Sequence, residues 1–373
     1  MYKPQIEIRV RPIIKVLSIQ NNFYYNRLFN HLKITIISKY TYFVGIDVSK
    51  QHLDYAVVQD GKVLANHRGD NTPKGILKTI KGLEKQFKGL TMANSLFCLE
   101  HTGIYSYPLL NTFKQEGADI WLEQAIQIQR SLGVQRGKSD PVDARRIALY
   151  AYKNRQEARL WVPRREVVEE IKELTNLRER CLKNISRHQK PIQELQSHGN
   201  PRIAKMIEDA CQAATEGERN ALAEIEAKID HFFKQDAELT RLYQLVTSVD
   251  GVGKCIAAQM IVDTNEFKNI REGKKYACHS GVAPFEHTSG STLRSPSRVS
   301  HRANKRSKTL LHMAALSAIR ISGEFKDYYQ RKVAEGKNKM SVINAIRNKI
   351  VLRVFACVRN NKVYQKNYVY TLA

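Results

Sequence analysis

The feature that most constrains the fold is a series of short apolar segments between residues 42 and 122, separated by polar and turn-forming residues. The first three have strand composition, and Asp60-Gly61 between the second and third is a hairpin signal. Apolar residues at helical spacing come next, and strands and helices then alternate. We predict strands at residues 42–48, 53–59, 62–67, 96–100 and 119–122, and helices at residues 76–87 and 105–115.

Three antiparallel strands followed by alternating helix and strand form the order of an RNase H-like α/β domain, which we place at residues 41–160. A helical coiled-coil segment is predicted at 161–246, a mainly α domain at 247–360 and a tail at 361–373. Residues 1–40 are basic and aromatic without clear periodicity, and we treat them as an N-terminal extension. Whether they belong to the native protein is left open at this stage.

The net charge indicates the class of partner. The chain has 61 Lys and Arg residues against 36 Asp and Glu, a formal charge of +25. Such an excess favours a polyanion, whose condensed counterions are released on binding, so DNA or RNA is expected. The alternatives are a ribosomal protein, which is usually shorter, and a membrane-surface protein, which needs an amphipathic anchor that the sequence lacks.

The cysteines and the apolar runs exclude other classes. Six cysteines lie far apart with no C-x-x-C pair, which fits neither a zinc site nor a disulfide framework. No apolar run approaches the roughly eighteen residues that a membrane span requires. We therefore expect a protein of a reducing cytoplasm with no membrane partner.

Two heptad-like seams predict long helices on either side of a break at Gly199-Asn200-Pro201. The first seam steps by four and three through residues 167–195, and Pro191 is expected to kink or end its helix. The second covers residues 222–246. An intramolecular helical hairpin and a dimerising coiled coil fit the two seams equally well.

Four acids are candidates for metal-ion chemistry. Asp47 interrupts the first apolar strand, where a charge is costly unless it faces a polar cleft. Glu100 ends the fourth strand, and Asp140 and Asp143 lie three apart at a predicted helix start. Cleavage of a phosphodiester needs hard oxygen ligands to converge on Mg²⁺ or Mn²⁺. Singly, each acid also fits a helix cap or a surface position, but together, in this fold order, they favour a metal site.

The second half carries a candidate nucleic-acid-binding surface. Gly251 and Gly253 precede an apolar helix; such a turn holds a phosphate in a helix-hairpin-helix element, although an ordinary tight turn fits equally well. Residues 294–353 are strongly basic, and three arginines at four-residue steps would line one face if their segment is helical. The residues predicted to contact nucleic acid are Lys138, Gly251, Gly253, Lys254, Arg294, Arg298, Arg302, Lys305 and Arg306.

Several motifs point to one known family. In the first half they are residues 42–50 (YFVGIDVSK), 100–103 (EHTG) and 138–145 (KSDPVDAR). In the second half they are residues 249–253 (VDGVG), 281–284 (GVAP), 289–290 (SG) and the basic stretch 298–306. Together they resemble the DEDD transposases of IS110-type insertion sequences, whose N-terminal domain is similar to RuvC resolvase. His101 and the Val282-Ala283 pair depart from the family pattern and touch no proposed ligand.

The resemblance implies a role for specific residues. Asp47, Glu100, Asp140 and Asp143 would form the acidic tetrad that binds metal, and Ser289 would be the nucleophile. Thr288 beside it leaves open which hydroxyl reacts, and without the family Ser289 would be interpreted as a turn residue. The resemblance also implies a structured guide RNA from the element. A homodimer or homotetramer with shared active sites is a further hypothesis, because a long helical segment separates the acids from the serine.

The sequence thus predicts an insertion-sequence transposase that cleaves and exchanges DNA strands between element ends and target. We expect this reaction to need Mg²⁺ or Mn²⁺, to be guided by RNA and to pass through a phosphoserine intermediate. A RuvC-like Holliday-junction nuclease, in which the same acids activate water, is the main alternative. A non-catalytic nucleic-acid-binding protein is the second.

Overall fold

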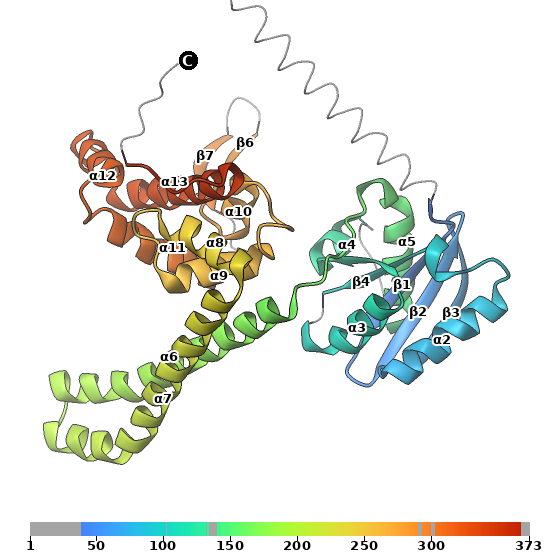
Figure 1. Cartoon of the computed structure of the whole chain (residues 1–373), viewed down its shortest axis with the longest axis horizontal. Helices are drawn as coiled ribbons and strands as arrows, with labels where there is room; N and C mark the ends of the chain where they lie inside the picture. The colour runs from blue at the N-terminus through green and yellow to red at the C-terminus, as the bar shows by residue number, and fades with distance from the viewer. Residues whose placement is uncertain are drawn as a thin grey trace, which may run out of the picture. The chain divides into compact units, whose positions relative to one another are not determined.

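The structure is a computed structural model that describes residues 39–101, 103–131, 133, 140–289, 293–299 and 303–366. The chain divides into two units, Met1–Pro163 and Arg164–Ala373, which are described one at a time (Figure 1). Among the described helices, none combines the length and the apolar composition that crossing a membrane requires.

The first unit is built on a mixed five-stranded sheet of order β3-β2-β1-β4-β5. Its strands are β1 (Tyr42–Val48), β2 (His52–Gln59), β3 (Lys62–Asp70), β4 (Ser95–Glu100) and β5 (Asp119–Glu123). The first three pair antiparallel, whereas β4 is parallel to β1 and β5 is parallel to β4. The predicted order of strands is therefore confirmed, with the first strand at the centre of the sheet.

Helices cover both faces of this sheet. On one face, α2 (Pro73–Gln86) and α3 (Tyr107–Gln115) pack on Val44 and Ile46 of β1. On the other face, α5 (Asp140–Lys153) packs on Phe43. This approach is so close that a Cβ atom at Gly45 would lie 2.2 Å from the Ala148 backbone nitrogen. The shorter elements are η1 (Met92–Asn94), η2 (Gly103–Ser106), α4 (Ala125–Ser131) and η3 (Arg155–Glu157).

The second unit opens with a helical hairpin of α6 (Glu166–His198) and α7 (Pro201–Gln235), which lie side by side in Figure 1. Arg178 of α6 pairs with Glu226 of α7 at 2.7 Å, and Asn184 donates to Glu218. The two seams thus pair within one chain, as the hairpin interpretation has it. Helix α6 continues through Pro191, so the proline does not end it.

The second seam is not one helix. Asp236 separates α7 from α8 (Ala237–Thr247), and its side chain caps α8 by accepting from the Leu239 N–H. Arg165, just before α6, donates to both Asp236 and the buried Glu266. These ion pairs tie the start of the hairpin to the rest of the unit.

The remaining helices share one hydrophobic core with the base of the hairpin. They are α9 (Lys254–Thr264), α10 (Gly273–His279), α11 (Lys305–Ala318), α12 (Glu324–Ala334) and α13 (Lys339–Asn360). Between α10 and α11 the chain forms an antiparallel ribbon of β6 (Pro284–Ser289) and β7 (Leu293–Val299). The helical interpretation of the segment that begins at Arg294 was therefore wrong, because residues 293–299 form a strand.

Candidate active site

The sheet brings two of the predicted acids together. Ile46 of β1 lies opposite Leu99 of the parallel strand β4, and Asp47 and Glu100 each follow by one residue. Because side chains alternate along a strand, Asp47 shares the face of Phe43 and Gly45, which is the face that α5 covers. Strand pairing thus places both acids at the carboxyl end of the central strands.

The start of α5 supplies the other two acids. Asp140 and Asp143 both lie in its first turn, and Gly45 lets this helix approach β1 without a side chain between them. The pKa of Asp47 is raised to about 6, first by burial and then by the negative charges of Asp143, Asp140 and Glu100. The charges of the other three predicted acids therefore act on Asp47, although the four acids come from three separate elements.

A fifth acid, Asp54, was missed by the sequence reasoning. It lies on β2 directly opposite Asp47, is 4% exposed, and also raises the pKa of Asp47. Arg68 of β3 donates to both of its oxygens, at 3.1 and 2.9 Å. The signal was present, since Asp54 interrupts an apolar strand between Leu53 and Tyr55 just as Asp47 interrupts its own.

Arginines accompany this carboxylate site, which we define as Asp47, Asp54, Glu100, Asp140 and Asp143. Arg68 reaches Asp140 at 3.3 Å in addition to Asp54. Arg146 donates to Asp143 at 2.7 Å. Positive charge from the protein thus offsets the like-charge repulsion at two edges of the site.

The carboxylate site fits a divalent metal by its chemistry. Mg²⁺ and Mn²⁺ prefer carboxylate oxygens, and clustered acids whose mutual repulsion raises a pKa are the groups that a cation stabilises. Among the described residues, however, no three His, Cys, Asp or Glu side chains lie close enough to share one ion.

The serine lies in the second unit. Ser289 is the last residue of β6 and pairs with Leu293, the first residue of β7, and Thr288 pairs with Arg294. Arg294 and Arg298 both belong to β7. Lys138 and Arg302 lie outside the described residues.

Gly251 and Gly253 lie in the turn that joins α8 to α9. Gly251 has a φ of +84°, and a Cβ atom there would lie 2.3 Å from the Ala314 carbonyl oxygen of α11. Packing against α11 therefore explains why a glycine occupies position 251. Gly253 precedes α9 with open space around its Cα, so the backbone at this helix start can be approached from solvent.

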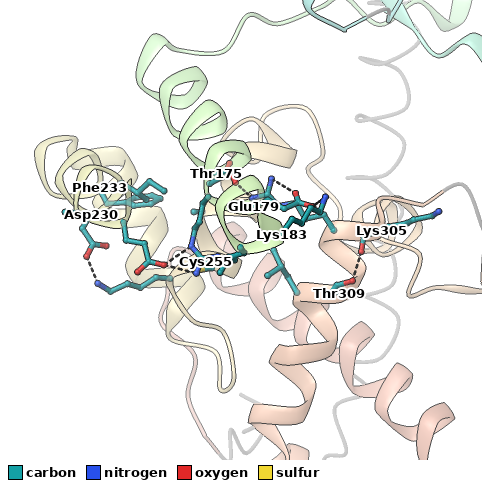
Figure 2. Close-up of a pocket in the computed structure, with 17 residues that line it drawn as sticks. Thr175, Glu179, Lys183, Asp230, Phe233, Cys255, Lys305 and Thr309 are labelled. Atoms are coloured by element: carbon teal, nitrogen blue, oxygen red, sulfur yellow. Dashed lines mark hydrogen bonds and ion pairs between the residues drawn. The ribbon is translucent and has the colours of Figure 1, made fainter. Parts of the chain in front are cut away.

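The other predicted basic residues line a cavity of about 670 Å³ where α6, α7, α9 and α11 meet (Figure 2). Lys254 pairs with Asp230, and Arg306 pairs with Glu179 at 3.3 Å and donates to the Thr175 carbonyl oxygen. Figure 2 shows Lys305 on the opposite side of the cavity from Asp230. Two of these three cations thus serve the packing of the helices, and none of the five acids lines this cavity.

Comparison with known proteins decides the family. Residues 44–198 match a family model described as transposase, and residues 243–330 match a model described as the transposase IS116/IS110/IS902 family. The chain belongs to the IS110 family of transposases. As a member of that family it is a DNA transposase or recombinase. The first match contains the five acids, and the second contains the β6–β7 ribbon.

Relatives of this transposase cover different shares of the chain. It is 20% identical to the pilin gene-inverting protein of Moraxella bovis over 328 residues, which are 87% of this chain and 98% of the relative. It is 24% identical to the insertion element IS116 uncharacterized 44.8 kDa protein of Streptomyces clavuligerus, over 32% of this chain and 30% of that protein. It is also similar to RuvC of Thermus thermophilus, with 16% identity and a TM-score of 0.26, over 32% of this chain and 98% of that one.

Proposed function

We propose that this transposase cleaves and exchanges DNA strands at a metal ion held by Asp47, Glu100, Asp140 and Asp143. The observation that carries the proposal is the raised pKa of Asp47, which is surrounded by the charges of the other three acids. A divalent ion bound there would supply Lewis-acid stabilisation of the charge that develops on the scissile phosphate. Asp54, whose two oxygens accept hydrogen bonds from Arg68, holds its position on β2 beside Asp47.

The covalent step is assigned to Ser289. Its Oγ forms a bond to phosphorus while the bond between phosphorus and the leaving sugar oxygen breaks. The serine proton passes to a base, and the leaving oxygen takes up a proton. Because a phosphodiester replaces a phosphodiester, the energy of the broken bond is kept for rejoining. Arg294 and Arg298 belong to the strand paired with that of Ser289, and we assign to them the role of offsetting the added negative charge.

The partners follow from charge and from the relatives. The formal charge of +25 suits DNA, which includes element ends and target, and a structured guide RNA transcribed from the element. The match to a protein named for inverting a pilin gene supports rearrangement of DNA rather than cutting alone. We place this activity at the nucleoid of a bacterial-type cytoplasm. A homodimer or homotetramer in which one chain's serine completes another chain's carboxylate site is part of the proposal.

The alternative is hydrolysis, in which the carboxylate site activates water and Ser289 takes no part. The observation that favours it is that all five acids belong to the first unit, whereas Ser289 belongs to the second. The two reactions differ at one atom, because only the first leaves DNA bonded to the protein.

A trapped adduct tests the assignment. The protein is incubated with DNA carrying the element ends, with RNA transcribed from the element and with Mg²⁺, and is then denatured. We expect a DNA adduct whose peptide contains Ser289. Ser289→Ala should lose the adduct and strand exchange yet still bind, while Thr288→Val, the matched control, should keep both. Normal cutting by Ser289→Ala would establish hydrolysis in place of exchange, and an adduct at Thr288 would move the assignment by one residue.

A further inference from the structure

The β6–β7 ribbon is joined to the helices at two points in the sequence. The chain enters it from α10, which ends at His279, and leaves it into α11, which begins after Asn304 (Figure 1). These two ends, which we call the roots of the ribbon, are bonded to each other. The Asn304 N–H donates to the His279 carbonyl oxygen at 2.8 Å.

A single buried carboxylate lies beneath both roots. Asp263 is in the last turn of α9, and its side chain is 8% exposed. On the side of the first root, its Oδ2 accepts from the Tyr276 hydroxyl at 3.0 Å. On the side of the second root, the same oxygen accepts from the Ser307 hydroxyl at 2.5 Å. Asp263 therefore links α10 and α11 through one atom.

Two further contacts complete this network. The His279 Nε2 atom lies 3.9 Å from Asp263 Oδ2. The other oxygen of Asp263, Oδ1, accepts from the Gln259 side chain at 2.7 Å, within α9 itself. A buried carboxylate is stable only when it is hydrogen-bonded in this way, so the network has a preferred geometry.

The strand that carries Ser289 is held on the same side. The N–H groups of Val282 and Ala283 both donate to the Ala277 carbonyl oxygen, at 2.9 and 3.2 Å. Asn344 of α13 donates to the Val282 carbonyl oxygen at 3.0 Å. The path from Asp263 to β6 thus consists of one helix turn and one short connection, each fixed by hydrogen bonds.

We propose that Asp263 is a positioning residue for strand exchange, which fixes the two roots of the ribbon and thereby the placement of Ser289. This rests on the proposed function for the role of the serine. Asp263 itself touches no reacting atom in this assignment. Ser289 lies at the end of the ribbon that is farther from its roots in the strand register. A small rotation at the roots therefore produces a larger displacement at Ser289.

The test compares a substitution that replaces the Asp263 carboxylate with one that removes a single hydrogen bond to it. Asp263→Asn keeps the volume but cannot accept from Gln259, Tyr276 and Ser307 together. We expect it to lower the rate of serine–DNA adduct formation at saturating DNA by about 30-fold, while affinity for DNA changes less than about twofold. Gln259→Met, the matched control, removes the 2.7 Å bond that reaches neither root. It should stay within about threefold of the unaltered protein in both measurements.

Two hydroxyl deletions guard against a variant that fails to fold. Tyr276→Phe and Ser307→Ala each remove one root contact, and each should lower the adduct rate about fivefold without a change in affinity. An adduct rate for Asp263→Asn equal to that of the unaltered protein would overturn the proposal. So would an equal fall in Gln259→Met, since loss of general stability would then explain both.

Hydrogen exchange separates this proposal from the assignment of the serine. Backbone amides of β6 and β7 should exchange faster in Asp263→Asn, whereas those of α13 should be unchanged. If the unaltered protein forms no adduct at Ser289, the proposed function fails and the exchange measurement alone decides whether Asp263 orders the ribbon. Unchanged exchange in the ribbon would then reject the positioning role.

Discussion

The predicted acids of the first unit and the predicted cations of the second were placed by the fold in opposite ways. Asp47 sits in a buried strand and is surrounded by other acids, so the structure gathers the predicted residues around it. Lys254 and Arg306 line a cavity between helices and pair with local acids instead. A charged residue in a buried strand indicates a functional site more clearly than a charged residue on a solvated helix face. Only the buried charge needs a specific partner to offset the cost of its burial.

The largest expected effect is on cleavage by the carboxylate site. Asp143→Ala should lower the rate of DNA cleavage in Mg²⁺ by roughly 10³-fold, because an anionic ligand of the metal is lost. Binding of the same DNA, measured by gel shift, should change little. Asp70→Ala is the matched control, since this acid of β3 is 72% exposed and belongs to no cluster of acids, and it should cleave normally. Cleavage by Asp143→Ala at the unaltered rate would mean that the gathered acids of the first unit do not form a catalytic site.

A smaller effect is expected where the hairpin of the second unit buries its seam. Ile171 is fully buried, so Ile171→Glu should lower the free energy of unfolding of that unit by about 3–5 kcal/mol. Leu177 is 37% exposed on the same helix, and Leu177→Glu should cost less than about 1 kcal/mol. Urea unfolding measures both. If Ile171→Glu instead gives a stably folded monomer from a protein that otherwise sediments as a dimer, the seam pairs between chains.

The smallest effect is a dependence of stability on pH at Asp47. Its pKa in the folded chain is raised from 3.8 to about 6, so the folded state binds a proton more tightly than the unfolded state. Stability should therefore fall as pH rises from about 4 to about 6, and the loss should be complete above that range. Asp47→Asn should remove this loss and stabilise the metal-free protein by about 1 kcal/mol at pH 7.5, after allowance for solvent screening.

Thermal unfolding with a chelator at pH 5 and pH 7.5 measures this effect. The gain from Asp47→Asn should be larger at the higher pH. An equal gain at both values would mean that the charge of Asp47 is not opposed by its neighbours. The charge of Asp47 would then be offset by nearby groups, as the charges of the predicted cations in the second unit are.

Much of the sheet unit was predictable because its apolar segments alternate with turn signals. The strand order followed from the succession of elements, and Asp47 and Glu100 followed from their places in it. Asp54 was not predicted, because it belongs to none of the motifs that resemble the family. Its pairing with Arg68 depends on the register of three strands, which no local pattern reveals.

The ribbon was predicted less well, for a different physical reason. Arginines four residues apart share one side of a helix, but a repeat of four is also a multiple of the strand period of two. The spacing therefore could not distinguish the two structures, and Pro296 within the segment was the better guide against a helix. The network around Asp263 was not predictable, since its members come from α9, α10 and α11 and carry no recurring spacing.

The contact at Gly45 has a consequence for how this active site varies. The strand acids and the helix acids belong to two separate pieces of structure, and their separation is set where α5 rests on β1. A methyl group at position 45 would push α5 away from β1. The distance between the strand acids and the helix acids would then change, although none of these acids had been substituted. The glycine at this position therefore sets the spacing of the carboxylates, and it contributes to the chemistry of the site as much as they do.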